Sequence, residues 1–366
     1  MLVVCESRRL ATGITTALDA AGREHLVIVT KATWQIPQPG QRPRPLSPQP
    51  LSYSDQFYGE PGESALRYGD DFAHHKPRCD VLFDACARPP GGQPVKALAV
   101  QVEVGTMTKL IKVLGPRYWK KRLGLYRLSA PAEFTQLPLH YGHAFGGTHS
   151  HSTPDGHPQA DTYPDNPVGM GWLAASNSDL ADSPAPSLEA FDAPVQQPAG
   201  HYPAMALSAI ARHWPQRMRY AGTCDDAWRA SQFPFLPEDF DTTYHQCAPL
   251  DQQIDYPRGG EPVGLTHLLA DRPTVRFNLP DLQHSVRVLR TDYSVEHLQP
   301  PVDTLFFETE ANRFSVVWRA STPIRRRIQE IDTVAVGPVD PHWWEARSLG
   351  LSADCTDCNQ RQEPAA

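Results

Sequence analysis

The fold class is decided by residues 98–114, which read LAVQVEVGTMTKLIKVL. Residues 98–104 predict a β-strand, and in its second half valines alternate with polar residues, so that a period of two places the valines on one face. A Gly-Thr pair separates this run from a second one at 108–114, so the two runs predict a hairpin. Residues 80–83 read as a preceding strand, and the whole stretch predicts a β-meander.

Strand patterns also occur on both sides of this stretch. Residues 24–36 predict a long strand, with Leu26, Ile28, Ala32 and Trp34 on one face and the intervening residues on the other. Five further runs near the end of the chain are spaced like a second antiparallel sheet. These runs are residues 275–277, 285–289, 304–308, 314–318 and 330–336.

Regular patterns fade in the middle of the chain, where prolines, glycines and aromatic residues recur every few positions. Short helices are predicted at 204–213 and at 224–231, the second with Thr223 or Asp225 as its N-cap. Another helical turn or two is expected within 239–246, and a short terminal helix from 342 to 351.

The expected architecture is therefore mainly β. It has two antiparallel, sandwich-like β-rich regions bridged by a long Pro/Gly-rich irregular segment with short helices, and these regions are expected to pack as one unit. The expected regions are an N-terminal β-rich region at 1–130, a loop-rich middle at 131–262, a C-terminal antiparallel region at 263–340, and a short helix with a frayed tail at 341–366.

Composition excludes several classes of protein. The 37 prolines among 366 residues are about twice the usual share, and proline is excluded from helix interiors, so a helical bundle is ruled out. A net charge of −7 gives no support to binding nucleic acid or an anionic membrane. No apolar run approaches the roughly 20 residues of a membrane helix.

The compartment is expected to be the cytoplasm. The stretch around Cys5 superficially resembles a lipoprotein cleavage site, but no basic region and no apolar run precede it. The seven cysteines are an odd number scattered along the chain, and they are interpreted as mostly reduced thiols.

A histidine-rich loop is the strongest candidate for chemistry. Histidine is the commonest metal ligand, so a metal-dependent hydrolase built on this loop is one alternative. The spacing provides no tight pair on a helix and no nearby cysteine, which favours solvated or hydrogen-bonded histidines. The five residues are His140, His143, His149, His151 and His157.

Other motifs are incomplete. Cys355 and Cys358 form a C-x-x-C unit that has no second pair for a zinc ribbon. The run from Gly142 to Thr148 lacks the lysine of a phosphate-binding loop. Neither Gly-x-Ser-x-Gly nor His-Glu-x-x-His occurs, so no catalytic, cofactor-binding or metal-binding residue is assigned. The basic runs at 117–122 and 325–327 favour solvated faces or an acidic protein partner over nucleic acid.

Short motifs nevertheless occur in a characteristic order along most of the chain. They are Lys76-Pro77 with Asp80; Gly115-Pro116-Arg117-Tyr118-Trp119; Ala144-Phe145-Gly146-Gly147; Asn166-Pro167-Val168-Gly169-Met170-Gly171; Pro198-Ala199-Gly200; Trp214-Pro215-Gln216-Arg217; Gly222-Thr223-Cys224-Asp225 with Trp228; Phe233-Pro234-Phe235-Leu236-Pro237 with Asp239-Phe240-Asp241; and Phe277-Asn278-Leu279-Pro280.

This series resembles the domain-of-unknown-function family 2169 over roughly residues 20–320. The family commonly has Gly-Asp-Arg where this chain has Gly115-Pro116-Arg117, and often an aromatic residue where Cys224 stands. Its glycines and prolines fix turns, and its Trp and Phe residues are expected to pin loops to the sheets by burial.

The resemblance implies an effector adaptor or chaperone of the bacterial type VI secretion system, not an enzyme and without a cofactor. Such a protein would bind the N-terminal segment of a secreted toxin and present it to the spike-tip proteins. A structural component of the spike is a further alternative. Exposed aromatic residues and arginines are the expected anchors, with core packing as the alternative for each. The candidate partner-binding residues are Arg117, Trp119, Trp343 and Trp344.

Overall fold

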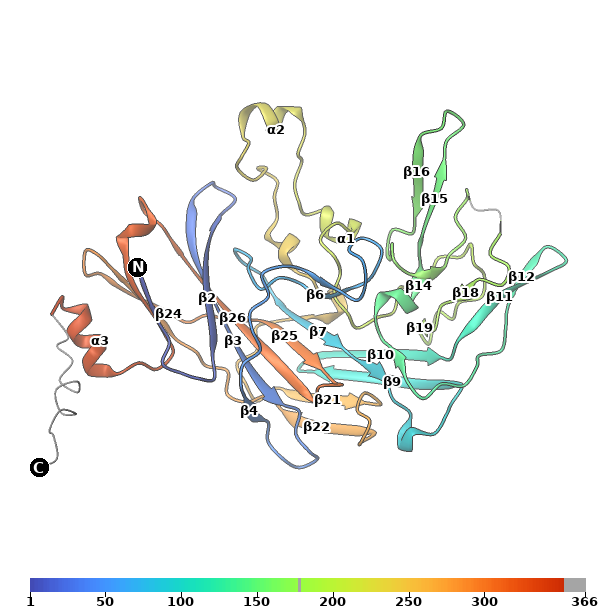
Figure 1. The fold of residues 1–366 in the computed structure, drawn as a ribbon, viewed down its shortest axis with the longest axis horizontal. Helices are drawn as coiled ribbons and strands as arrows, with labels where there is room; N and C mark the ends of the chain where they lie inside the picture. The colour runs from blue at the N-terminus through green and yellow to red at the C-terminus, as the bar shows by residue number, and fades with distance from the viewer. Residues whose placement is uncertain (177–178, 352–366) are drawn as a thin grey trace, which may run out of the picture.

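The computed structural model describes residues 1–176 and 179–351. It confirms a mainly β fold, with 38% of residues in strands and 10% in helices. Most strands belong to three sheets in the lower part of the molecule, and two slender elements project from one side (Figure 1).

A seven-stranded sheet, which we call the central sheet, forms the middle of the molecule (Figure 1). All its neighbouring strands are antiparallel except β25 and β7, which run parallel. Its strands in spatial order are β2 (Ala11–Leu18), β3 (Glu24–Gln35), β26 (Arg313–Pro323), β25 (Val302–Glu308), β7 (Cys79–Asp84) and β20 (Gln253–Ile254), with β4 (Arg44–Leu46) also paired to β3.

Two further sheets flank the central sheet. The five-stranded sheet consists, in order, of β19 (Leu188–Glu189), β10 (Met107–Leu114), β9 (Ala97–Val104), β21 (Pro262–Thr266) and β22 (Thr274–Asn278). The four-stranded sheet consists, in order, of β1 (Leu2–Val4), β27 (Ile331–Val336), β23 (Val286–Arg290) and β24 (Val295–Leu298). The five-stranded sheet combines strands from residues 97–114, 188–189 and 262–278, so segments that are distant in the sequence fold together.

The remaining strands form small ladders. They are β5 (Gln56–Phe57) with β6 (Leu66–Tyr68); β8 (Cys86–Ala87) with β13 (Leu137–Pro138); β12 (Leu125–Leu128), β11 (Arg117–Arg122) and β18 (Pro184–Ala185); β14 (Phe145–Gly146) with β17 (Met170–Gly171); and β15 (Thr148–Ser152) with β16 (Pro158–Thr162).

Helices are few and short. The α-helices are α1 (Pro215–Met218), α2 (Asp226–Ser231) and α3 (Pro341–Ser348), and the 3-10 turns are η1 (Pro90–Gly92), η2 (Tyr141–His143), η3 (Thr242–His245), η4 (Leu250–Gln252) and η5 (Ile328–Glu330). None of those in the described ranges is long and apolar enough to span a membrane.

The two flanking sheets cover different parts of one face of the central sheet. Leu26, Ile28 and Ala320 contact the apolar residues of the four-stranded sheet. Further along β26, on the same face, Val316 and Trp318 belong to the main core, which includes the inner faces of the five-stranded sheet. Each fully buried aliphatic or aromatic side chain contributes about 1.5–3 kcal/mol. The long strands β3 and β26 therefore join the two flanking sheets through one continuous surface.

The opposite face of the central sheet is covered by the loop that follows β4. Leu51 and Phe72 from this loop pack on Val27, Val29 and Val317. The predicted strand at 24–36 is confirmed as β3, and its central residues are buried on both faces. A strand covered on both faces explains why residues 26–29 are all apolar instead of alternating with polar residues.

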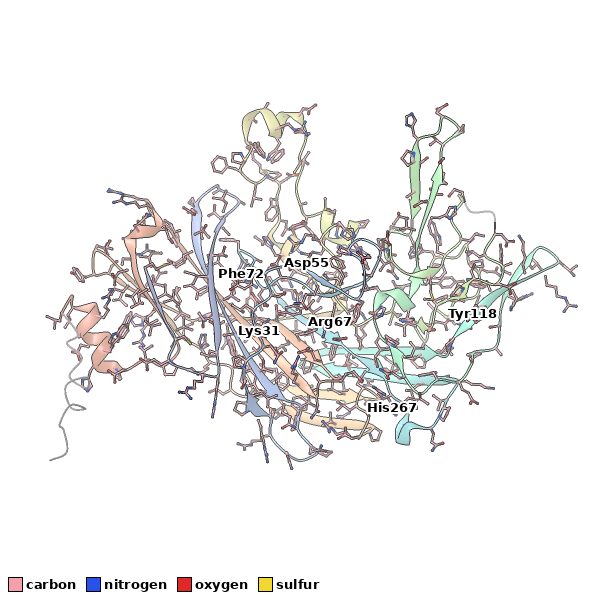
Figure 2. All side chains as sticks on the ribbon, in the orientation of Figure 1. Lys31, Asp55, Arg67, Phe72, Tyr118 and His267 are labelled. Atoms are coloured by element: carbon pink, nitrogen blue, oxygen red, sulfur yellow. The ribbon has the colours of Figure 1, made fainter. Side chains whose placement is uncertain are left out.

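Buried ion pairs lie between this loop and the sheet. The Lys31 ammonium is 2.5 Å from Asp71 Oδ2, and Tyr68 donates its hydroxyl to the same carboxylate. Burial lowers the pKa of Lys31, although the Asp71 carboxylate opposes that shift. Figure 2 labels Lys31 and Phe72, which mark the polar and apolar parts of this covered face.

Asp80 on β7 is the most buried carboxylate of this face, with no exposed surface. Lys76 Nζ lies 3.0 Å from its Oδ2, and the backbone N–H of Cys247 donates to the same oxygen. Its Oδ1 accepts from Gln246 Nε2 at 2.5 Å and from the N–H of Ala248 at 3.1 Å. Burial alone would raise the pKa of Asp80, but Lys76 and these N–H groups outweigh it and lower the pKa.

Several local predictions are confirmed. Residues 98–114 form the β9–β10 hairpin in continuous register. The helix expected at 224–231 is α2, and Asp225 is its N-cap because its carboxylate accepts from the N–H of Trp228. The turn within 239–246 is η3, and the terminal helix is α3.

The predicted meander is wrong in its first strand. Residues 80–83 lie in β7, which belongs to the central sheet, whereas β9 and β10 belong to the five-stranded sheet. Strand β7 is buried along almost its whole length and needs a partner on each side, which β25 and β20 provide. The predicted second antiparallel sheet is likewise wrong, because its five runs are divided among the three sheets.

The predicted helix at 204–213 does not form. Leu207 N–H donates to Leu139 O, and Ile210 N–H donates to Cys247 O. These N–H groups therefore bond to distant segments instead of to carbonyl groups one helical turn earlier. Residues 206–211 are all buried. A helix would expose one side of this run, whereas an extended segment in the core buries both.

Replacing Asp80 should test the buried pair. We expect Asp80→Asn to lower the free energy of unfolding by about 3–5 kcal/mol, because it leaves the Lys76 ammonium buried without its counter-charge. Urea unfolding followed by circular dichroism measures this change.

The matched control is Asp255→Asn, because the Asp255 side chain is fully exposed although it also faces an arginine. We expect this control to change stability by less than about 0.5 kcal/mol. Adding Lys76→Met to Asp80→Asn should recover part of the loss. Equal stability of the Asp80 and Asp255 variants would contradict the proposed role of the pair.

Candidate functional site

An arm formed by residues 220–241 projects from the molecule and carries α2 at its tip (Figure 1). The two chain segments of its stem are joined where Asp241 N–H donates to Tyr220 O at 3.0 Å. Further out, Thr223 donates its N–H and its hydroxyl to the two carboxylate oxygens of Asp239, at 2.8 and 2.7 Å. These hydrogen bonds tie the two sides of the stem together.

The tip of the arm is ordered by a tryptophan. Trp228 on α2 donates its indole N–H to Phe235 O at 3.0 Å and packs edge-on against Phe233. Phe235 also packs over Gly22, in the turn between β2 and β3, so closely that a Cβ on Gly22 would lie 3.1 Å from its ring. Gly22 has a φ of +73°, which suits glycine for a second reason.

Aromatic residues of this arm remain exposed. The exposed fraction of Phe233 is 65% and that of Phe235 is 48%, and Met218 at the end of α1 is also exposed. The expectation that such residues pin loops by burial is wrong for these two phenylalanines. Two exposed aromatic residues close together on an ordered projection fit a protein-binding surface, where aromatic residues are enriched.

A cavity of about 340 Å³ lies at the base of the arm. Its apolar lining includes Tyr141, Ile210 and Leu250. Gln216 also lines it, and its Nε2 donates to Asp165 O at 2.7 Å. The Gln216 Oε1 atom has no partner within the described residues. The cavity is of the size that accepts one large side chain or a small ligand.

The base of the arm is held by charged groups. Arg217 is buried and donates to Tyr244 O at 2.9 Å and to Ile210 O at 3.0 Å. Arg212, just before α1, donates to both carboxylate oxygens of Asp55 at 2.9 Å. Burial alone would raise the pKa of Asp55, but the Arg212 guanidinium outweighs burial and lowers it. Figure 2 labels Asp55.

The sequence-predicted residues Arg117 and Trp119 lie elsewhere, on β11 (Arg117–Arg122). Trp119 has no exposed surface and donates its indole N–H to Gly171 O at 2.9 Å. Arg117 is buried, donates to Pro186 O at 2.9 Å, and pairs with the Glu189 carboxylate. Their contacts are those of core packing. The neighbouring Tyr118 is exposed and lies far from the arm (Figure 2).

Trp343 and Trp344 lie on α3, at the opposite end of the molecule from β11 (Figure 1). Trp344 is buried, and the Arg287 guanidinium stands 4.5 Å from the centre of its ring. Trp343 is half-buried and packs in the same cluster. The structure does not bring the four predicted partner-binding residues together.

The five histidines of the candidate metal loop do not converge on one point. His140 and His143 lie at η2, with ring centres 4.8 Å apart, and His140 stacks on Tyr58. His149 and His151 are on β15, and His157 is in the turn that follows it. No group of three or more potential metal ligands occurs among the described residues.

Cysteines add no further site to the described chain. Cys5, Cys79, Cys86, Cys224 and Cys247 are all free thiols. Cys355 and Cys358 lie outside the described residues.

The two basic runs contain residues paired with carboxylates. Arg325 pairs with Asp292 at 3.2 Å, and Lys120 and Lys121 on β11 pair with Asp182 and Asp179.

The fold and the arm define a mainly β protein that displays aromatic residues on an ordered projection. The chain belongs to the family described as an uncharacterized protein conserved in bacteria (DUF2169), whose model matches residues 21–319. The matched range contains the arm and the central core beneath it. No curated protein and no solved structure matches the chain.

Acid should lower the free energy of unfolding through His245, which lies in η3 just after the arm. Burial, followed by repulsion from Arg319, Arg217, Lys76 and His74, lowers the pKa of His245 to about 3, against 6.5 when unfolded. The unfolded chain therefore binds this proton first as the pH falls below 6.5. We expect the free energy of unfolding to drop between pH 6.5 and 4, by up to about 1.4 kcal/mol per pH unit from this group.

Urea unfolding at several pH values, for the native protein and for His245→Gln, checks this prediction. Glutamine does not titrate, so the variant should show a shallower loss of stability over the same range. The native protein at pH 7.5, where His245 is neutral in both states, gives the reference. Identical slopes for the two proteins would contradict the prediction.

Exposure of the arm can be tested with a hydrophobic dye. We expect Phe233→Ser to reduce the fluorescence of bound anilinonaphthalene sulfonate, because the dye binds exposed apolar surface. The stability should change by less than about 1.5 kcal/mol, since Phe233 is 65% exposed and its loss removes an edge-on ring contact with Trp228. Leu123→Asn is the control, because Leu123 is 95% exposed in the β11–β12 turn, outside the arm, and loss of one aliphatic side chain there should reduce the fluorescence less than loss of the Phe233 ring. Unchanged dye binding in the Phe233 variant would contradict the prediction.

Proposed function

We propose that this protein is an effector adaptor of the type VI secretion system. It binds the N-terminal segment of a secreted toxin in the cytoplasm, keeps that segment soluble, and presents it to the spike-tip proteins. Its role is binding, without catalysis, nucleic acid or membrane insertion. The observation that carries this proposal is the projecting arm, which the family-like motifs at 222–241 build and which exposes Phe233 and Phe235.

The structure of the arm supports a binding role. Its stem is closed by the Thr223–Asp239 bonds and its tip by Trp228, so its exposed rings are fixed before a partner arrives. A preordered surface loses little conformational entropy on binding. Exposed aromatic rings held in a fixed position are among the residues from which binding hot spots are commonly made.

The residues also suit a chaperone for an apolar segment. Phe233, Phe235, Met218 and Leu250 are all exposed and lie on or near the arm and the cavity at its base. A toxin segment that covers them would remove apolar surface of both partners from water. This contact would account for solubility of the segment only while the adaptor is bound.

Deletion of the gene in the producing bacterium tests the proposal. We expect secretion of one toxin to stop while secretion of the tube protein continues, because an adaptor loads cargo and does not build the machine. The toxin should also lose abundance, because its uncovered segment exposes apolar surface. Immunoblots of the medium and of the cells measure both proteins.

Complementation supplies the matched controls. The native gene and the Leu123→Asn variant should restore toxin secretion, and the Phe233→Ser variant should restore it poorly. Loss of the tube protein from the medium would favour a structural component of the spike instead. Normal secretion of every toxin in the deletion strain would contradict the adaptor proposal.

A further inference from the structure

Strand β2 (Ala11–Leu18) forms one edge of the central sheet. It pairs with β3 in unbroken register from Ala11↔Lys31 to Leu18↔Glu24. No second strand pairs with it among the described residues. With eight residues, β2 is the longest edge strand in the described part of the chain.

The pairing register shows which backbone groups of β2 face outward. Asp19 N–H donates to Arg23 O at 2.9 Å, which makes this position a hydrogen-bonded pair. Hydrogen-bonded positions alternate along an antiparallel pair, so the odd-numbered residues of β2 bond to β3. The even-numbered residues therefore direct their N–H and C=O groups away from the sheet. They are Thr12, Ile14, Thr16 and Leu18.

Strand β3 independently supports this assignment. Ile36 N–H donates to Asn312 O, and Ile324 N–H donates to Glu24 O, so the backbone groups of the even-numbered residues of β3 bond to β26. The backbone groups of its odd-numbered residues therefore point toward β2. Within the described residues, the one hydrogen bond recorded at the outward groups of β2 is from the Thr15 hydroxyl to Thr16 O, at 3.4 Å.

The edge lacks the usual protection against strand pairing. Exposed edge strands commonly carry a charged residue, a proline or a bulge that prevents association. The sequence of β2, ATGITTAL, has no charge and no proline, and its register has no shift. By contrast β4, which also pairs with β3, contains Arg44 and Pro45.

The surroundings of this edge indicate what would pair with it. At its start, Arg8 and Arg9 are exposed and have no recorded ion pair within the described residues. At its end, the turn at Gly22 touches Phe235 of the arm. A strand beside β2 would therefore meet positive charge at one end and exposed aromatic rings at the other.

We propose that β2 is the docking strand for an extended segment of the partner, which adds to the central sheet in antiparallel orientation. The segment has an apolar residue at its amino end, next to the arm, then uncharged β-branched residues, and acidic residues at its carboxyl end, next to Arg8 and Arg9. The four outward N–H groups and four outward C=O groups of β2 supply the main-chain bonds, as in other cases of strand addition. This inference rests on the proposed function, because it assigns the toxin segment to a site.

Residue-resolved amide exchange tests the proposal on the intact protein. In the free protein, the amides of Thr12, Ile14, Thr16 and Leu18 should exchange at least tenfold faster than those of their odd-numbered neighbours. Slow exchange at these four positions would overturn the proposal, because it would show that the edge is already covered.

The probe is a synthetic peptide with one phenylalanine at its amino end, alternating threonine and valine, and two aspartates at its carboxyl end. Its binding should slow exchange at the same four amides and leave the odd-numbered amides unchanged. A matched peptide with two lysines in place of the aspartates should bind more weakly. Failure of the first peptide to bind, or binding without protection of these amides, would overturn the proposal.

Substitution at the edge gives a second measurement. Thr16→Pro removes one outward N–H and should weaken binding of the probe by roughly three- to tenfold, whereas Thr16→Val keeps that N–H and should not. Thr16 is exposed, and proline is tolerated on an edge strand. Equal affinity of the two variants, with both folded by circular dichroism, would count against strand addition.

These measurements separate the docking strand from the adaptor role. If the toxin depends on the protein for secretion but the Thr16→Pro strain secretes it normally, the docking strand is wrong and the adaptor proposal stands. If the deletion strain secretes every toxin normally while the four amides are protected by the probe, the edge binds strands and the adaptor proposal is wrong.

Discussion

A carboxylate buried on β7 of the central sheet is the constraint from which much of this architecture follows. A charge removed from water is costly unless it is paired and hydrogen-bonded. Asp80 meets this requirement with Lys76, four positions earlier, and with donors at 246–248, which lie immediately after the arm. The same interaction therefore stabilises β7 and fixes the point where the stem of the arm returns to the core.

Local features of the fold could be predicted from the sequence because they depend on neighbouring residues. The alternation at 98–104, the turn at Gly105 and the cap at Asp225 each act within a few positions, and each forms as expected. Sheet membership could not be predicted, since it depends on which distant strand lies alongside. The segment at 204–213 shows the limit, because tertiary hydrogen bonds outweighed a moderate local preference for helix.

The candidate site was not predicted from the sequence, although its motifs are among those that carry the family resemblance. The run from Phe233 to Pro237 looks like a loop anchor, because aromatic residues between prolines are commonly buried. Nothing in that run shows that Phe233 packs on Trp228 and Phe235 on the turn at Gly22 while both rings remain exposed. Trp119 presents the opposite case: it looks like an interface anchor and has no exposed surface. Exposure depends on the elements that cover a residue, and these are distant in the sequence.

In the proposed docking, the arm and the β2 edge would make complementary contributions to one mode of recognition. Main-chain bonds to an edge accept many sequences, whereas exposed rings at a fixed position favour particular side chains. An extended segment that orders on binding loses conformational entropy, typically about 2–5 kcal/mol, which lowers its affinity. A rigid sheet and a closed arm stem add little to that loss. Such a complex can be specific without being too tight to release, and release is what a carrier requires when it transfers its cargo to the next protein.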